Sequence, residues 1–184
     1  MKDLPFSLSL KHRRLPAKYF TFRRCTAQDI DEIMSLQNLV SSRLEDEDLF
    51  VCNTREAYEE AMAEDFCFAA YTEGHLVYCS LMILNRQTPY HLGHYLHYTE
   101  EELLRSVSYD ISFVHPAYRG FSLQRLGMNV KDEYARALGA VEALATVSPK
   151  NLHSLANARA HGFEILERRH MYRDVERFIL RKKL

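Results

Sequence analysis

Short runs of apolar and aromatic residues, several of them alternating with polar ones, recur along the chain and predict β-strands. The expected strands are residues 19–24, 66–72, 75–84, 107–114, 141–147, 163–172 and 177–184. Glu73-Gly74 separates the second strand from the third, and such a pair is typical of a two-residue hairpin. The pattern therefore predicts a sheet of about seven strands, in which some neighbours are antiparallel.

Between these runs, apolar residues recur at helical spacing. The expected helices are residues 27–40, 55–65, 100–106, 122–138 and 151–161. Thr26 is an N-cap for the first helix, and Thr99 with Glu102 forms a capping box for the third. Gly139 and Gly162 end the last two. The buried face expected for the helix at 122–138 carries Leu123, Leu126, Val130, Tyr134 and Leu138.

The order of these elements mixes antiparallel hairpins with strand–helix–strand units, so neither a purely doubly wound sheet nor a sandwich fits. We expect an α/β (α+β) fold with a mixed central sheet and helices on both faces. Residues 18–184 are expected to form a single domain. Residues 1–17, basic at "KHRR" and broken by Pro5 and Pro16, are expected to form an N-terminal arm.

The composition is ordinary for a globular protein: 184 residues, 47% hydrophobic and 27% charged, with a formal net charge of −1. This balance argues against nucleic-acid binding. No apolar run approaches the ~18 residues of a membrane helix, and the N-terminus lacks the features of a signal peptide. The four cysteines form no C-x-x-C pair, so we expect reduced, mostly buried thiols in a cytoplasmic protein. They are Cys25, Cys52, Cys67 and Cys79.

The stretch "VHPAYRGFSLQRLG" (114–127) joins the end of an expected strand to the start of a helix. The first backbone N–H groups of a helix have no partner within it, and the helix dipole is positive there. Arg119 adds a positive charge, and Gly120 allows close approach to the backbone. These features together predict an anion-binding site.

Two motifs resemble those of the GNAT (N-acetyltransferase) superfamily. "VHPAYRGFSLQRLG" is similar to its pyrophosphate loop, usually V-x-P-x-x-R-G-x-G-x-G/A, and "ATVSPKNLHSLANARAHGFEI" to its later strand and helix. The resemblance covers about residues 19–184. It implies the GNAT fold and direct transfer of an acetyl group from acetyl-CoA to a primary amine. The acceptor would be an unidentified small molecule or peptide. The resemblance leaves open whether the protein forms a homodimer.

The same resemblance assigns residues to the cosubstrate. The backbone of Phe113 and Val114 would bind the pantetheine arm, with Asn151 and Ser154 beside it. The pyrophosphate cradle would consist of Arg119, Gly120, Phe121, Ser122, Leu123 and Gln124.

The sequence departs from the family pattern at three positions. Ser122 and Gln124 stand where the family has glycine and glycine or alanine. Both keep the backbone N–H, provided that these positions avoid positive φ, and Ser122 can cap the helix. Ala158, seven residues after Asn151, stands where many members have a tyrosine that protonates the departing thiolate.

The candidate general base is Asp110, on the strand before the loop and four residues ahead of Val114, on the side of the strand opposite Tyr109. It could equally be a strand aspartate that faces solvent or pairs with a basic residue. The general acid could be Tyr172, another pocket tyrosine or bulk water.

Two further segments carry alternatives. His91, His94 and His97 could suggest a metal site, but no carboxylate or cysteine stands at ligand spacing, so no metal is expected. The segment could instead line an acceptor pocket or pack on the surface. The acidic run at 44–50 is either a solvated face or a negatively charged surface that attracts a cationic acceptor. A non-catalytic acyl-CoA-binding module is the main alternative function, ahead of a histidine-based metal enzyme.

Overall fold

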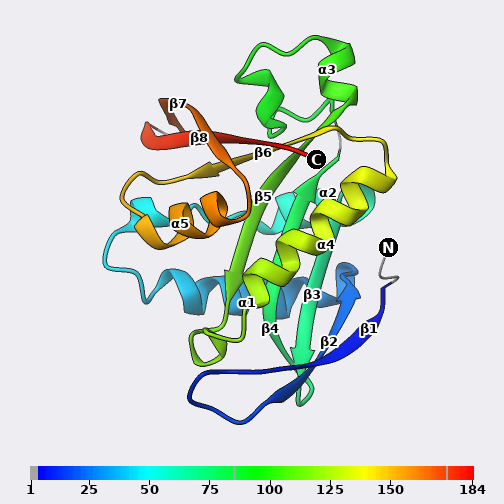
Figure 1. The fold of residues 1–184 in the computed structure, drawn as a ribbon, viewed down its shortest axis with the longest axis vertical. Coiled ribbons are helices and arrows are strands. Elements are labelled where there is room, and N and C mark those ends of the chain that lie inside the picture. The colour runs from blue at the N-terminus through cyan, green and yellow to red at the C-terminus, as the bar shows by residue number, and fades with distance from the viewer. Residues whose placement is uncertain (1–3, 85, 173) are drawn as a thin grey trace.

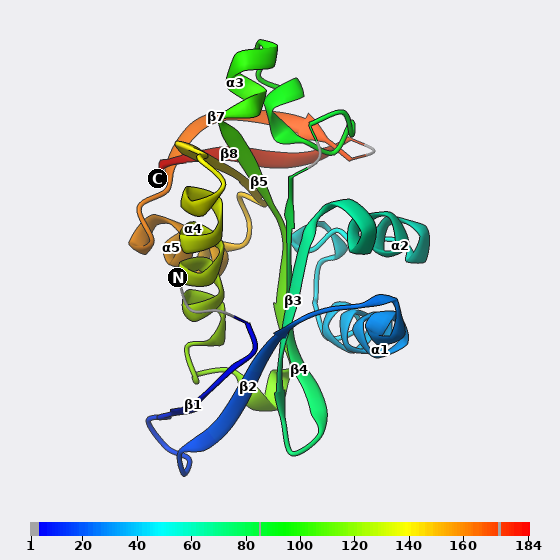
Figure 2. The same ribbon diagram turned by 90° about the vertical axis from the view of Figure 1, so that its right-hand side faces the viewer.

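The computed structural model describes residues 4–84, 86–172 and 174–184, and its centre is an eight-stranded sheet of order β1-β2-β3-β4-β5-β6-β8-β7 (Figures 1 and 2). Every neighbouring pair is antiparallel except β5 and β6. The strands are β1 (Phe6–Leu10), β2 (Lys18–Arg24), β3 (Phe66–Thr72), β4 (His75–Ile83), β5 (Ser106–Val114), β6 (Glu142–Val147), β7 (Glu164–Met171) and β8 (Val175–Lys183).

Helices cover both faces of the sheet, as the sequence predicts. They are α1 (Ile30–Ser41), α2 (Arg55–Glu64), α3 (Glu100–Leu104), α4 (Leu123–Ala137) and α5 (Leu152–Ala160). Figure 2 shows α1 and α2 on one face and α4 and α5 on the other. No helix in the described part of the chain is long and apolar enough to cross a membrane.

Most of the expected local signals hold, but the residue at the N-cap of α1 is Asp29 rather than Thr26. Thr54 accepts a hydrogen bond from the amide of Ala57 at the start of α2, and Thr99 with Glu102 forms the capping box of α3. Glu73 and Gly74 both have positive φ, as a tight hairpin turn requires. The helix predicted at 27–40 is a 3₁₀ turn followed by α1.

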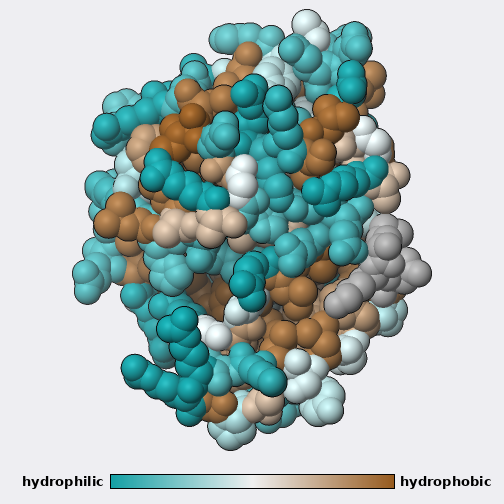
Figure 3. Space-filling view, viewed as in Figure 1, coloured by the Kyte–Doolittle hydropathy of each residue, from teal (hydrophilic) through white to brown (hydrophobic). Residues whose placement is uncertain are grey.

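The segment expected to be an arm contributes β1, which pairs with β2 and adds a strand to the seven that the sequence predicts. Its Phe6 ring stacks on Phe22 with centroids 5.0 Å apart. The apolar alternation of five residues was too short to identify a strand without knowing its partner. Polar side chains cover the outer face of α4, and apolar side chains gather between α4 and the N-terminal strands (Figure 3).

The buried face of α4 differs from the one expected. Leu123 and Val130 are buried, but Leu138 is 49% exposed, and the charged Lys131 and Asp132 are buried instead. Gly127 faces β4, where a Cβ would collide with the hydroxyl of Tyr78. The helix therefore lies closer to the sheet than its large apolar residues alone would allow.

The sheet opens between its two parallel strands. The β5–β6 ladder runs from the pair Ser106–Glu142 to the pair Tyr109–Ala145 and ends there. Beyond it, β5 continues to Val114 alongside β4, whereas β6 continues alongside β8. The strands thus separate, and β5 carries an irregular, bulged register just past Tyr109. This opening positions the candidate site.

Candidate active site

A cavity of about 750 Å³ occupies the opening between β5 and β6. One wall is formed by α4, α5 and the loop after β6, with Gln124, Met128, Ser148, Asn151, Ser154 and Ala158. The other is formed by the segment before α2, the segment between β4 and α3, and the β7–β8 hairpin, with Asn53, Tyr90, Tyr172 and Arg177. Such a volume suits a small molecule or the reactive end of a larger one.

Asp110 lies at the bulge of β5 and lines the cavity. The amide nitrogen of Asn53 donates a 2.8 Å hydrogen bond to its Oδ2. Burial raises the pKa of Asp110, while the Asn53 hydrogen bond and the charge of Lys131 oppose that rise. Asp110 is half-buried in the cavity wall rather than freely solvated, and its role as general base stays a prediction.

The side-chain parity expected for β5 is wrong beyond Tyr109. Tyr109 points toward α4, as expected, and donates a 2.6 Å hydrogen bond to Asp132. The bulge then interrupts the alternation, so Val114 packs in the core under α4 while Asp110 contacts Asn53 on the other side. Bulges of this kind commonly re-aim a side chain at a functional site.

Lys131 is a cavity residue that the sequence analysis missed. Its side chain is 2% exposed, and its ammonium lies 4.4 Å from the centre of the Tyr109 ring and 3.5 Å from the carbonyl oxygen of Leu81. Burial lowers the pKa of Lys131 to about 8, although Asp110 and Asp132 act to raise it. The available signal was two adjacent charges inside the apolar face of a helix.

Asp132, the next residue, joins four elements outside the cavity. Its carboxylate accepts hydrogen bonds from Tyr109 of β5, from Lys182 of β8 and from His161 after α5, the last at 3.1 Å. Burial alone would raise the pKa of Asp132, but these three donors outweigh it and hold the pKa at about 2. The network fixes α4 against the strands beside the cavity.

Tyr172 lies in the β7–β8 turn and lines the cavity, with its hydroxyl 3.4 Å from Oγ1 of Thr146. Burial raises its pKa to about 12, so the phenol keeps its proton at neutral pH. Ala158 also lines the cavity and is 7% exposed, which leaves a methyl group where a hydroxyl would be expected by resemblance. The half-buried Tyr172 and the buried Lys131 are therefore two proton donors in the cavity wall.

The loop before α4 differs from expectation in one residue. Gly120 has a φ of +88°, consistent with the need for glycine. Ser122 has a φ of 61°, although a residue here was expected to avoid positive φ. Its side chain does not cap the helix, which is also contrary to expectation. The N-terminal amides of α4 are therefore left without a side-chain cap. Arg119 is exposed beside them.

The segment between β1 and β2 lies against this loop. The His12 ring lies 4.9 Å from that of Phe121, and a Cβ on Gly120 would collide with His12. The basic segment "KHRR" is consequently held next to the loop that carries Arg119.

The remaining candidates fall into two groups. Gln124, Asn151 and Ser154 line the cavity with Asp110 and Tyr172. The residues that do not line it are Phe113, Val114, Arg119, Gly120, Phe121, Ser122 and Leu123, which follow the end of β5 and the loop. The side chains of Phe113, Phe121 and Leu123 are buried, so only their backbone groups can reach a ligand. Asn151 caps α5 by accepting a 3.0 Å hydrogen bond from the Ser154 amide.

The acidic run reaches the cavity through its last two residues, Leu49 and Phe50. Lys150, after β6, binds Asp46 at 2.8 Å and Asp48 at 3.0 Å. Nδ2 of Asn151 donates a 3.4 Å hydrogen bond to the carbonyl of Leu49. Two of these acids are therefore engaged within the chain.

The three histidines do not converge. His91 is fully buried, its Nε2 lying 3.3 Å from the carbonyl oxygen of Ser106, and burial lowers its pKa to about 4. His94 contacts the carbonyl oxygen of Arg86 at 2.9 Å. Within the described ranges, His97 forms no metal-ligand group with them. Of the segment 90–98, Tyr90 is the residue that reaches the cavity.

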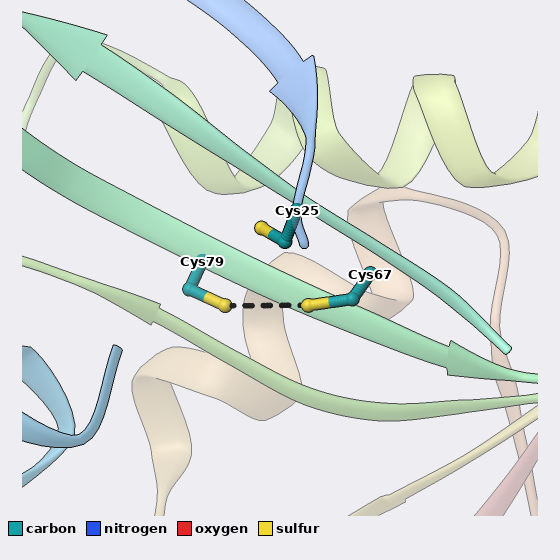
Figure 4. Close-up of side chains that lie close together, drawn as sticks. All are labelled: Cys25, Cys67 and Cys79. Carbon is teal, nitrogen blue, oxygen red and sulfur yellow. Dashed lines mark hydrogen bonds between the residues drawn. The ribbon is translucent and has the colours of Figure 1, made fainter. Parts of the chain in front are cut away.

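Three cysteines do converge, on the α1 side of the sheet (Figure 4). The sulfur atoms of Cys25, Cys67 and Cys79 all lie within 4.8 Å of one another, and those of Cys67 and Cys79 are 3.8 Å apart. Three thiolates suit a soft metal ion, although tetrahedral zinc takes four ligands. The trio is buried among apolar residues and does not line the cavity, whereas Cys52 is exposed.

No protein-family model matches the sequence, and no curated protein matches it. Solved structures do match the fold. An acetyltransferase of the GNAT family from Streptococcus pneumoniae is 16% identical, with a TM-score of 0.67 over 90% of this chain and 99% of its own. A Salmonella typhimurium protein, solved with its cofactor acetyl-CoA, is 15% identical, with a TM-score of 0.64 over 90% and 94%.

The PaiA N-acetyltransferase of Thermoplasma acidophilum, solved in complex with coenzyme A, is 10% identical, with a TM-score of 0.63 over 90% of this chain and 99% of its own. These likenesses extend over nearly the whole of both chains in each case. The chain therefore has the fold of the GNAT acetyltransferases.

Proposed function

We propose that the protein is an N-acetyltransferase that moves an acetyl group from acetyl-CoA directly to a primary amine of a small molecule or peptide. The observation that carries this proposal is the opening between β5 and β6. It brings a carboxylate at a strand bulge and Gln124, in the first turn of the uncapped helix α4, to one cavity. The neighbours that were solved with acetyl-CoA or coenzyme A support the choice of cosubstrate.

In this proposal the pyrophosphate binds at the start of α4. The amides of Ser122, Leu123 and Gln124 donate hydrogen bonds there, the helix dipole favours an anion, and Arg119 adds a positive charge. The backbone of Phe113 and Val114, where β5 has left β6, pairs with the amide groups of the pantetheine arm. Asn151 and Ser154 line the opposite wall.

The acceptor amine enters from the side of Asn53 and Asp110. The ammonium loses two protons, one to solvent and one to Asp110, and its nitrogen forms a bond to the thioester carbonyl carbon. The carbon–sulfur bond then breaks, and the thiolate receives a proton from Tyr172 or Lys131 in place of the tyrosine that Ala158 replaces. Four free cysteines are consistent with a reducing, cytoplasmic setting for this reaction.

Binding of the cosubstrate is tested by thermal unfolding. Acetyl-CoA at about 100 times its Kd should stabilise the protein by about 2.7 kcal/mol. Arg119→Glu should abolish most of this protection, because a repelling charge replaces an attracting one. Arg136→Glu, at the other end of α4, should keep it. Equal protection of all three proteins would exclude the pyrophosphate site.

Transfer is tested by release of the CoA thiol across a panel of primary amines. Asp110→Asn should lower kcat/KM by about 10²- to 10⁴-fold and leave protection by acetyl-CoA unchanged. Protection of the wild type without thiol release for any amine would favour the non-catalytic acyl-CoA-binding module, the alternative that the methyl group of Ala158 supports.

A further inference from the structure

Arg177 is a buried guanidinium in the wall of the cavity. It lies on β8, is 4% exposed, and its Cζ lies 6.0 Å from the centre of the Tyr172 ring. Within the part of the chain that the structure describes, its buried Nε and Nη2 have no hydrogen-bond partner. No ion pair to a carboxylate is present there either.

Two carboxylates could be expected to pair with Arg177, but both bind other residues. Asp48, whose charge acts on the pKa of Arg177, binds Lys150 at 3.0 Å. Glu176 binds Arg168 on the neighbouring strand. Burial lowers the pKa of Arg177, but an arginine side chain keeps its charge at neutral pH. A charged guanidinium thus stands in the cavity wall without an ion-pair partner among the described residues.

The unpartnered edge has a defined shape. Nε and Nη2 of an arginine lie parallel and match the two oxygens of a carboxylate. The same hairpin shows this pairing: Nε and Nη2 of Arg168 donate to the two oxygens of Glu176 at 2.5 and 2.6 Å. In Arg177 the same two nitrogen atoms have no partner among the described residues, and its side chain lines the cavity.

The cosubstrate phosphates do not account for this edge. In the proposed function they lie at the start of α4, whereas Phe178, next to Arg177, packs on the α4 side and Arg177 projects to the other side of the sheet. Asp110 also lies away from the α4 side, where it contacts Asn53, and both Asp110 and Arg177 line the cavity. The guanidinium therefore belongs to the acceptor side of the cavity, whose wall also holds Asp110.

We propose that Arg177 binds a carboxylate of the acceptor, which makes the acceptor an amino acid or a similar small molecule with an amine and a carboxylate. This inference rests on the proposed acetyl transfer for the role of the amine. A buried, unpartnered charge destabilises a fold, so its retention in the cavity wall is explained by a ligand that neutralises it.

Binding to CoA-saturated protein tests the proposal without requiring turnover. The probes are the common L-amino acids, each paired with its own carboxamide, measured by calorimetry. At least one amino acid should bind at least 10-fold more tightly than its amide. Arg177→Met should lower the affinity for that amino acid by about 10- to 100-fold and leave the affinity for the amide unchanged. A fold-change of this size corresponds to the free energy that hydrogen bonds to charged groups contribute.

Two further variants control the experiment. Arg168→Met removes an arginine of the same hairpin that already has its carboxylate, and it should bind the amino acid like the wild type. Arg177→Lys keeps the charge but loses the paired donors, so its affinity should fall between those of the wild type and Arg177→Met. The melting temperature of Arg177→Met without ligand should equal or exceed that of the wild type, which confirms folding.

The outcomes separate this inference from the proposed function. If every amino acid binds no better than its amide, or if Arg177→Met weakens both equally, the carboxylate site is refuted. If an amino acid binds through Arg177 but never releases CoA thiol from acetyl-CoA, the carboxylate site stands and the acetyl transfer is refuted. Acetylation of decarboxylated amines at the same kcat/KM as their parent amino acids would refute the site and retain the transfer.

Discussion

Asp110 and Lys131 approach the cavity from opposite faces of the sheet, and each changes the ionisation of the other. Burial pushes the pKa of the carboxyl up and that of the ammonium down, while their mutual attraction acts against both shifts. Asp110 alternates with Tyr109 onto the face away from α4, and the bulge of β5 begins directly after Tyr109. In the proposed reaction, Lys131 therefore sets the pH range over which Asp110 can accept a proton.

Replacing Lys131 tests this coupling. Lys131→Met removes the positive charge that lowers the pKa of Asp110, so that pKa should rise and the acidic limb of kcat/KM should move to higher pH by about one pH unit. Rate profiles of wild type, Lys131→Met and the exposed control Arg125→Met give the comparison. An unshifted acidic limb in Lys131→Met would show that the two groups are not coupled in the working enzyme.

Tyr172 is the second residue whose role a single substitution decides. With its pKa raised to about 12, the phenol is protonated throughout the physiological range and can donate to the departing thiolate. Tyr172→Phe should lower kcat by about 10²-fold and leave the Kd of acetyl-CoA unchanged. Tyr90→Phe, on the exposed rim of the cavity, is the matched control. If both variants keep full kcat, Lys131 or solvent supplies the proton.

At the scale of elements, the close contact of α4 with β4 depends on Gly127. Tyr78 is fully buried, and its hydroxyl, which accepts a hydrogen bond from Ser112 at 3.1 Å, occupies the place of the missing Cβ. Any larger residue must push the helix away from the sheet. Because Lys131 stands one turn further along the same helix, that displacement would also reach the cavity.

Gly127→Ala should therefore destabilise the protein by about 1–3 kcal/mol, despite the better helix propensity of alanine, because the site has no room for a methyl group. Asn129→Ala, at an exposed position of α4, should be neutral or stabilising. Denaturant unfolding of both variants gives the measurement. The double variant with Tyr78→Phe should recover part of the loss, and equal stability of Gly127→Ala and Asn129→Ala would contradict the close contact.

The elements also show which features a sequence can predict. Caps, hairpin turns and the strand–loop–helix motif are local, so Thr99, Gly74 and Gly120 identify them without knowledge of the fold. The bulge at Asp110, the pairing of β1 with β2 and the left-handed conformation of Ser122 depend on distant partners. Charges inside an apolar helix face were visible in the sequence, but their burial was not.

Across the whole molecule, the roles of Arg177 and Asp132 were equally hidden from the sequence. The surroundings of each are formed by segments that lie far away along the chain. Arg177 meets the cavity only because β8 lies next to β6, and the Asp132 carboxylate meets Tyr109, His161 and Lys182 only in the folded chain. Asp132 thus links both halves of the opened sheet to α4. Loss of this link should affect the stability of the entire domain.

The pKa of Asp132, held at about 2, gives the sign of its effect on stability. A carboxyl whose pKa is lower in the folded than in the unfolded state stabilises the fold above about pH 4, and this contribution disappears as the pH falls toward 2. The shift corresponds to about 2 kcal/mol at neutral pH. Asp132→Asn should therefore lower the free energy of unfolding by at least that amount at pH 7.

Denaturant unfolding of the wild type and Asp132→Asn between pH 7 and pH 2.5 checks this expectation. The difference between the two proteins should be largest at pH 7 and should shrink steadily below pH 4, as the wild-type carboxyl loses its advantage. Asp31→Asn is the control, because its exposed ion pair with Arg55 should contribute less than about 1 kcal/mol at any pH. A difference that stays constant down to pH 2.5 would mean that shape, rather than the charge of Asp132, holds α4 to the sheet.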